Sequence, residues 1–144
     1  GRKLNMDKGA AMQALIVDME TTVGELGQAA GDDLATIRAA LVEGIKALAG
    51  ATEWILNSRD PNAVMAVSVD YLMLAGYVCG GWQMARAALA AQGKLMNGVD
   101  PVFHEGKLLT ARYYAEHILP KAGALLRSVQ SGGASILAMT EEQF

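Results

Sequence analysis

Apolar residues recur every three or four positions along the first part of the chain, which is the spacing of one face of an α-helix. One stripe predicts a helix over about residues 7–29, through Met12, Leu15, Ile16, Met19, Val23 and Leu26. A second stripe predicts a helix over about 33–58, through Leu34, Ile37, Leu41, Ile45, Leu48, Ile55 and Leu56. Gly31 separates the two helices, and Asp32 or Asp33 is suited to cap the second.

Two Asp-Pro pairs mark the starts of two further helices. Asp60-Pro61 and Asp100-Pro101 each place an acidic cap before a proline, which is favoured at the first helical position. The third helix is predicted over about 61–96, and the fourth from about 101 to the Ser131-Gly132-Gly133 segment. Pro120 is expected to kink or break the fourth helix, because proline lacks an amide hydrogen and clashes one turn back.

Four helices joined by short connections predict an all-α fold for residues 1–144 as a single domain. The arrangement that we expect is an up-and-down antiparallel four-helix bundle. The tail Ala134–Phe144 is predicted to add a short helical turn, capped by Thr140.

Fifteen residues of the third helix, Tyr71–Ala85, carry no charge. Such a helix has no side suited to water, and it is shorter than the roughly 20 apolar residues of a membrane crossing. We therefore expect other helices to surround it. Gly76, Gly80 and Gly81 lie inside this stretch, although a helical glycine costs about 1 kcal/mol relative to alanine. Two explanations stay open for them: tight packing within the bundle, or contact with a separate domain or subunit.

Composition and charge narrow the class of protein. The chain has 144 residues, 52% hydrophobic and 19% charged, which fits one domain with its own core. A net charge of -3 argues against nucleic acid as a partner, because phosphate binding needs a concentrated basic surface. Cys79 is the single cysteine, which fits a reducing compartment, and we expect a cytoplasmic location. We interpret Cys79 itself as a small buried apolar residue.

The sequence patterns of metal, haem and phosphate sites do not occur in the chain. Di-iron bundles use Glu-x-x-His, whereas Glu105 is followed three residues later by Leu108. His104 and His117 have no cysteine partners at zinc-site spacing, and a single cysteine does not suit haem attachment. We therefore assign no catalytic, cofactor-binding or metal-binding residue. Both histidines are interpreted as structural residues, one at a helix start and one near the kink.

Three sets of side chains each have two interpretations. The basic residues flanking the uncharged stretch form a solvated face with local ion pairs, or they contact an acidic partner; they are Arg86, Lys94, Lys107 and Arg112. The aromatic residues at helical spacing belong to the core, or they anchor an interface; they are Trp54, Trp82, Tyr113 and Tyr114. The eight methionines fill gaps in a core, or they line an adaptable groove.

Three blocks of sequence carry a family resemblance. The first is Gly1-Arg2-Lys3-Leu4 with Asp7 and Gly9. The second is Tyr71-Leu72-x-Leu74-x-Gly76-Tyr77, followed by Gly80-Gly81-Trp82 and Ala85-Arg86-Ala87-Ala88. The third comprises Phe103, Lys107, Ala111-Arg112-Tyr113-Tyr114-Ala115 and His117-Ile118-Leu119-Pro120, and the chain ends in Glu141-Glu142-Gln143-Phe144. Together these blocks resemble the extra C-terminal domain of one branch of the acyl-CoA dehydrogenases, over nearly the whole chain.

The resemblance implies that the chain is a piece of a longer flavoprotein. The parent would use FAD to oxidise an acyl-CoA thioester to the 2-enoyl-CoA in fatty-acid or related catabolism, and it would pass electrons to an electron-transfer flavoprotein. In that family the carboxylate base and the main flavin segment precede the Gly-Arg-Lys-Leu block. The resemblance therefore implies a non-catalytic structural domain without cofactor, and it gives Glu105 and Glu116 no catalytic role. The expected partners are the remainder of the parent chain and further copies of it in a homo-oligomer.

A different class of function stays open beside this one. The apolar, methionine-rich third helix also suits a free-standing four-helix interaction module, or one that encloses a small lipid-like ligand. A native protein much larger than 15.2 kDa would distinguish the parent enzyme from such a module.

Overall fold

The computed structural model describes residues 2–143, and the regular elements among them are all helical. The all-α fold class is therefore confirmed. Five helices have eleven or more residues: α2 (Ala10–Gln28), α3 (Asp32–Asn57), α5 (Ser68–Met96), α6 (Pro101–His117) and α7 (Lys121–Ser131). The short helices are α1 (Arg2–Met6), α4 (Pro61–Ala66), α8 (Ala134–Leu137) and the 3-10 helix η1 (Glu141–Gln143).

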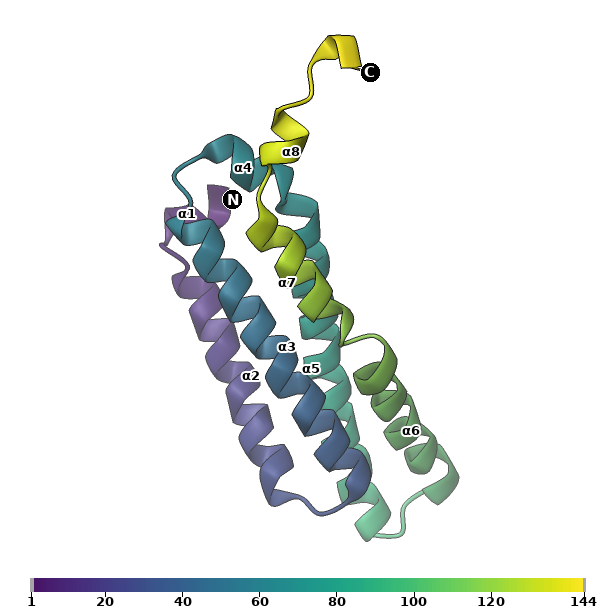
Figure 1. Cartoon of the computed structure of the whole chain (residues 1–144). Helices are drawn as coiled ribbons and strands as arrows, with labels where there is room; N and C mark the ends of the chain where they lie inside the picture. Colours follow the sequence, from purple (N-terminus) through teal and green to yellow (C-terminus); the bar gives the residue numbers. More distant parts are fainter. Residues whose placement is uncertain (1, 144) are drawn as a thin grey trace.

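The helix α5 lies at the centre of the packing. It contacts α2, α3, α4, α6 and α7, and α3 in turn contacts α2, α6 and α7. The long helices run side by side, with α6 and α7 following one another along one side (Figure 1). The chain passes down α2, up α3, down α5 and up through α6 and α7 in this view. The core thus lies between α3 and α5, covered by α2 on one side and by α6 and α7 on the other.

The predicted helix starts are confirmed at both Asp-Pro pairs. Asp60 accepts a hydrogen bond from the amide of Asn62 at 2.9 Å, and α4 begins at Pro61. Asp100 accepts one from the amide of Phe103 at 3.4 Å, and α6 begins at Pro101. Each carboxylate satisfies an amide that has no partner within the first turn.

The first predicted helix, 7–29, starts later than expected. Gly9 has a φ of 80°, in the left-handed region that glycine adopts at little cost, and it separates α1 from α2. Asp7 stabilises this turn, because its carboxylate accepts hydrogen bonds from the amides of Gly9 and Ala11, both at 3.0 Å.

The predicted single helix over 61–96 is wrong at one position. The chain departs from helical geometry at Val67, whose side chain is buried, so α4 and α5 are separate helices. The apolar spacing continues through Val64, Val67 and Leu74, which is why periodicity alone did not reveal the break.

Pro120 breaks the fourth helix rather than merely bending it. The helix α6 ends at His117 and α7 begins at Lys121. Between them Leu119 points into the core and is almost fully buried. It fits there because Gly44 on α3 and Gly81 on α5 have no side chains: a Cβ on them would approach the Leu119 side chain to 3.0 and 2.9 Å. Of the two explanations for the glycines, packing within the bundle therefore holds for Gly81.

Gly80 and Gly76 differ in whether a side chain of this chain lies against them. A Cβ on Gly80 would collide with the hydroxyl of Tyr114, so this glycine also makes room for a side chain. A Cβ on Gly76 would meet nothing within 4 Å. Packing within the chain therefore does not account for Gly76.

The expectation that other helices surround Tyr71–Ala85 holds for one side of α5 only. Leu74, Val78, Gly81 and Ala85 are buried, whereas Leu72, Met73 and Gly76 on the opposite side are exposed. The methionines also differ from the core interpretation. Only Met19 is fully buried, and the exposed ones are Met6, Met65, Met73, Met96 and Met139.

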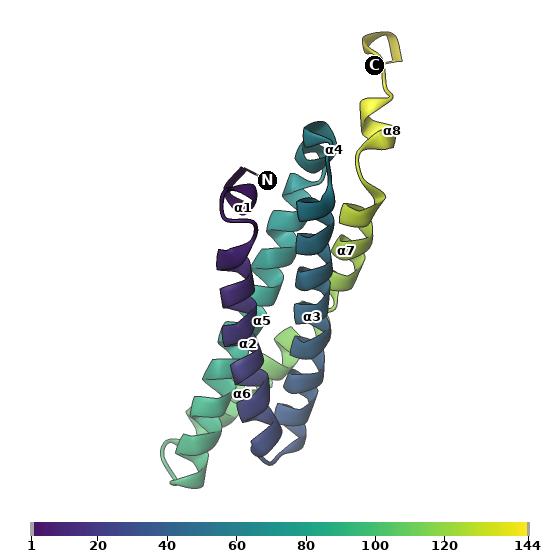
Figure 2. The same ribbon diagram turned by 90° about the vertical axis from the view of Figure 1, so that its left-hand side faces the viewer.

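The C-terminal segment forms the predicted helical turn as α8 and η1. Within it, α8 packs on α4, where a Cβ on Gly133 would lie 2.6 Å from that of Ala66. The amide of Thr140 donates to Gln143 Oε1 at 2.9 Å at the start of η1. Beyond α8 the chain extends away from the long helices (Figure 2).

The packing of Leu119 against Gly81 predicts how substitutions of the glycines change the stability of the chain. Gly81→Leu should lower the free energy of unfolding of the 144-residue chain by about 2–3 kcal/mol, because the core has no space for the new side chain. The matched control, Gly76→Leu, should raise it by about 0.5–1 kcal/mol, since leucine is the better helix former and meets open space. Urea titrations of both variants provide the measurement, and equal effects at the two positions would contradict this account of the packing.

Candidate functional site

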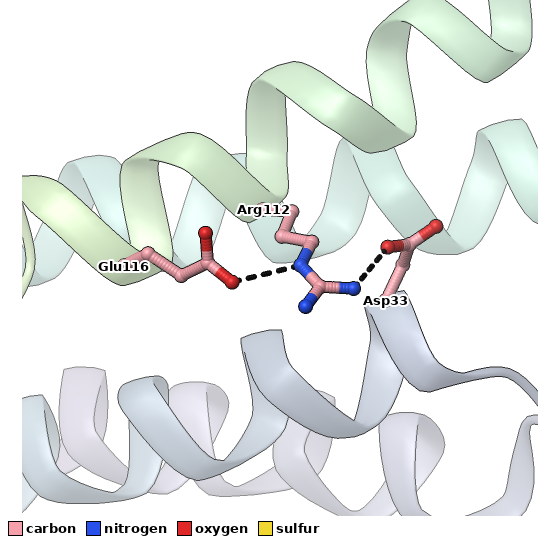
Figure 3. A network of polar contacts seen from close by, with 3 residues as sticks. All are labelled: Asp33, Arg112 and Glu116. Atoms are coloured by element: carbon pink, nitrogen blue, oxygen red, sulfur yellow. Dashed lines mark hydrogen bonds and ion pairs between the residues drawn. The ribbon is translucent and has the colours of Figure 1, made fainter.

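One polar cluster joins two helices at the surface (Figure 3). Arg112 on α6 donates from Nε to Glu116 Oε1 at 2.8 Å and from a terminal nitrogen to Asp33 Oδ1 at 2.9 Å. Asp33 lies in the first turn of α3, where a negative charge is favoured by the helix dipole. The two carboxylates raise the pKa of Arg112 further above its usual value, so the guanidinium stays charged. The cluster ties α6 to the start of α3.

The carboxylates of α6 are placed in different surroundings. Glu116 is engaged with Arg112, and Glu105 lies exposed in the first half of the helix. Among the residues that the structure describes, no three His, Cys, Asp or Glu side chains lie close enough together to hold a metal ion.

The histidines lie where the sequence predicted. His104 is in the first turn of α6, and its ring meets the edge of Phe103 with centroids 5.1 Å apart. His117 is the last residue of α6, at the Pro120 break, and its ring lies 4.8 Å from that of Tyr113.

Three aromatic side chains connect α5 to its neighbours through hydrogen bonds. Trp82 Nε1 donates to Thr22 Oγ1 on α2 at 2.8 Å. Tyr71 shares a hydrogen bond of 2.9 Å with Thr52 on α3. The hydroxyl of Tyr114 on α6 donates to the backbone carbonyl of Tyr77 on α5 at 2.9 Å.

The interpretation of four aromatic residues at helical spacing as core residues is confirmed for three of them. Trp54, Trp82 and Tyr114 are half-buried and pack against the core, whereas Tyr113 is exposed. Burial raises the pKa of both Tyr71 and Tyr114, because it disfavours the phenolate.

Most of the basic residues that flank the uncharged stretch have local partners. The Arg86 guanidinium lies over the Trp82 ring at 5.4 Å, and the Lys107 ammonium lies over the Phe103 ring at 5.2 Å. Arg112 is held in the cluster described above, and Lys94 is exposed. These contacts agree with the interpretation as a solvated face with local pairs.

Cys79 is half-buried rather than fully buried. Its thiol is unpaired among the described residues, and burial raises its pKa, which keeps the thiol protonated and weakly nucleophilic.

Among the hollows on the surface of the described residues, four are open and have volumes of about 400–570 Å³ each. One lies between α3 and α7 around the Pro120 break and is lined largely by alanine and glycine. Another, of about 420 Å³, lies between α1 and the first turns of α5, and its lining includes Leu4, Met12, Val69, Tyr71 and Leu72. Within residues 2–143, no helix has the length and hydropathy that a membrane crossing requires.

Beside the hollow between α1 and α5, the helix α5 presents an apolar side to solvent. We call it the outer face of α5, and its members are Val69, Leu72, Met73 and Gly76. Sequence reasoning missed this face, although its signal was present: the residues are spaced i, i+3, i+4 and i+7, beside the buried stripe of Leu74, Val78 and Gly81. Of these two apolar stripes, only the one with Leu74, Val78 and Gly81 packs against other helices of the described chain.

Comparison with known proteins supplies the family. The family described as acetyl-CoA dehydrogenase C-terminal like matches residues 10–140. A 3-methylmercaptopropionyl-CoA dehydrogenase from Ruegeria pomeroyi is 33% identical over 139 residues, which is 95% of this chain. A butyryl-CoA dehydrogenase from Syntrophomonas wolfei is 28% identical over 150 aligned positions, which is 99% of this chain. The chain spans only 24% of the length of each of these relatives.

The buried tyrosines make stability depend on pH in the alkaline range. The pKa values of Tyr71 and Tyr114 are raised in the folded chain, so their stabilising effect is complete below the ordinary pKa of about 10 and is lost as pH rises through the folded values. We expect the free energy of unfolding to fall above about pH 10. Replacing both residues with phenylalanine should flatten that fall, as followed by urea unfolding from pH 8 to 11. An equally steep fall in the double variant would contradict the assignment.

Proposed function

Because the chain belongs to the family of acyl-CoA dehydrogenase C-terminal domains, we propose that it is the non-catalytic, structural C-terminal domain of a longer FAD-dependent dehydrogenase. The observation that carries this proposal is the family match over residues 10–140. The two relatives, each about four times as long as the matched region, leave ample length for a catalytic body outside it.

The polar side chains of this chain support a structural role. Arg112 connects α6 to α3, Trp82 connects α5 to α2, and Tyr71 connects α5 to α3. Each bond joins two helices that are distant in sequence, so these groups hold the helices in register. If α6 and α7 are counted together as the fourth helix, we class the fold as an up-and-down four-helix bundle.

The parent enzyme would oxidise an acyl-CoA thioester to the 2-enoyl-CoA, in fatty-acid or related acyl-CoA metabolism. Bound to the body, FAD would supply the hydride acceptor for this oxidation, and a carboxylate of the body would serve as the base for the α proton. The hollows described above are open to solvent, which supports the proposal that the flavin binds outside this chain. We therefore assign FAD to the body and to no residue of this chain, and Glu105 and Glu116 are given no part in the chemistry.

The proposed partners follow from the same assignment. The first is the dehydrogenase body, the second is another copy of the parent in a homo-oligomer, and the third is an electron-transfer flavoprotein that accepts electrons from the parent. A cytoplasmic location is part of the proposal, and the unpaired thiol of Cys79 supports it.

The test is to isolate the native protein from source cells with an antibody against this segment. We expect a protein several times larger than 15.2 kDa, with a flavin absorption spectrum that bleaches when an acyl-CoA is added. The purified 144-residue chain, as the control, should bind no flavin and oxidise no acyl-CoA. A native protein near 15.2 kDa would overturn the proposal and favour a free-standing module.

A further inference from the structure

The outer face of α5 is open in this chain although it is apolar. Val69 is 68% exposed, Leu72 is 70% exposed and Met73 is 45% exposed. Their spacing places them with Gly76 on one side of the helix, over two turns without a charged residue on that side. Single exposed apolar residues are ordinary, but a contiguous uncharged helix face indicates a surface that is covered in the native protein.

Gly76 is a second feature of this face. A glycine inside a helix costs about 1 kcal/mol relative to alanine, and a contact with a partner would offset that cost. Gly80 and Gly81 have contacts within this chain, with Tyr114 and Leu119, but a Cβ on Gly76 would meet nothing. Because it lacks a side chain, Gly76 leaves room for close approach from outside the domain.

A hollow adjoins this face and lies between it and α1. Its lining includes Lys3 and Leu4 of α1 on one side, and Val69 and Leu72 of α5 on the other. The helix α1 lies at the same end of the bundle as the start of α5 (Figures 1 and 2). Any residues that precede this segment in a longer chain therefore enter beside the outer face of α5.

Resting on the proposed function, we propose that the outer face of α5 and the adjoining hollow bind the dehydrogenase body of the parent enzyme. The relatives supply the occupant, since about three quarters of their length lies outside the match to this chain. The chemistry agrees, because permanent interfaces are more apolar and less charged than transient ones. An apolar helix or loop of the body fits this face. Leu72 would pack against its side chains as the anchor, and the backbone of that helix or loop would pass over Gly76.

The outer side of α6 is the competing surface, and it fits the body less well. It exposes Val102, Phe103, Leu109 and Tyr113, and a Cβ on its Gly106 would meet nothing within 4 Å either, but it lies farther from α1 than the start of α5 does (Figure 1). Tyr113 also has an aromatic neighbour of its own, since it stacks on His117. Leu109 is 63% exposed and therefore serves as a matched control for Leu72.

The test uses the full-length parent with the photo-crosslinking residue benzoylphenylalanine at single positions. Leu72→benzoylphenylalanine should attach, on irradiation, to peptides of the dehydrogenase body, which peptide mapping by mass spectrometry identifies. Leu109→benzoylphenylalanine should yield at least about tenfold less of the same attachment, because its contacts are with solvent.

Several results would overturn the proposal. They are attachment of position 72 to the helical segment of a second copy, attachment to a lipid, no attachment at all, and equal yields at positions 72 and 109. Flavin content and acyl-CoA oxidation of the same preparation report separately on the proposed function. A flavin-free parent that still crosslinks at position 72 would contradict the enzymatic assignment and support the docking surface. An active parent without the crosslink would support the enzymatic assignment and contradict the docking surface.

Discussion

The structure depends on the packing of α5, because the other long helices all lie against it. Its inner side carries small residues, among them Gly81, Ala85 and Ala88, which let α3 and the connection between α6 and α7 approach closely. Leu119 fills the space that Gly44 and Gly81 leave, so the residue before Pro120 is anchored in the core while Pro120 itself is exposed. The break therefore supplies a side chain that a continuous helix would have directed elsewhere.

The sequence predicted those features that depend on local chemistry. Asp60-Pro61 and Asp100-Pro101 begin helices because a carboxylate and a proline act on the first turn alone. The same local logic located the Pro120 break. The break at Val67 was missed, because Val64 and Val67 keep the apolar spacing and nothing in the local sequence opposes a continuous helix. The partners of Trp82 and Arg112, Thr22 and Asp33, lie 60 and 79 residues away, and pairings over such separations depend on tertiary packing.

The proposed docking surface rests on a difference between the sequence expectation and the fold. An uncharged helix was expected to be surrounded, yet the chain covers only the inner side of α5 and leaves Leu72 and Met73 in solvent. Gly80 and Gly81 face side chains of this chain, whereas Gly76, one turn before Gly80, faces none. Since the family to which the chain belongs occurs within longer dehydrogenases, a covering body resolves the conflict without any change in the fold.

The most direct measurement is the rate at which hydrogen peroxide oxidises each methionine of the native full-length protein, followed by peptide mass spectrometry. Met19 is fully buried, Met96 is 80% exposed at the far end of α5, and Met73 is 45% exposed on its outer face, so all three are compared within one molecule. Because oxidation follows exposure, a covered outer face predicts that Met73 reacts about tenfold or more slowly than Met96, close to the rate of Met19. A rate for Met73 within about twofold of that for Met96 would show that the face is open to solvent, and it would contradict the account.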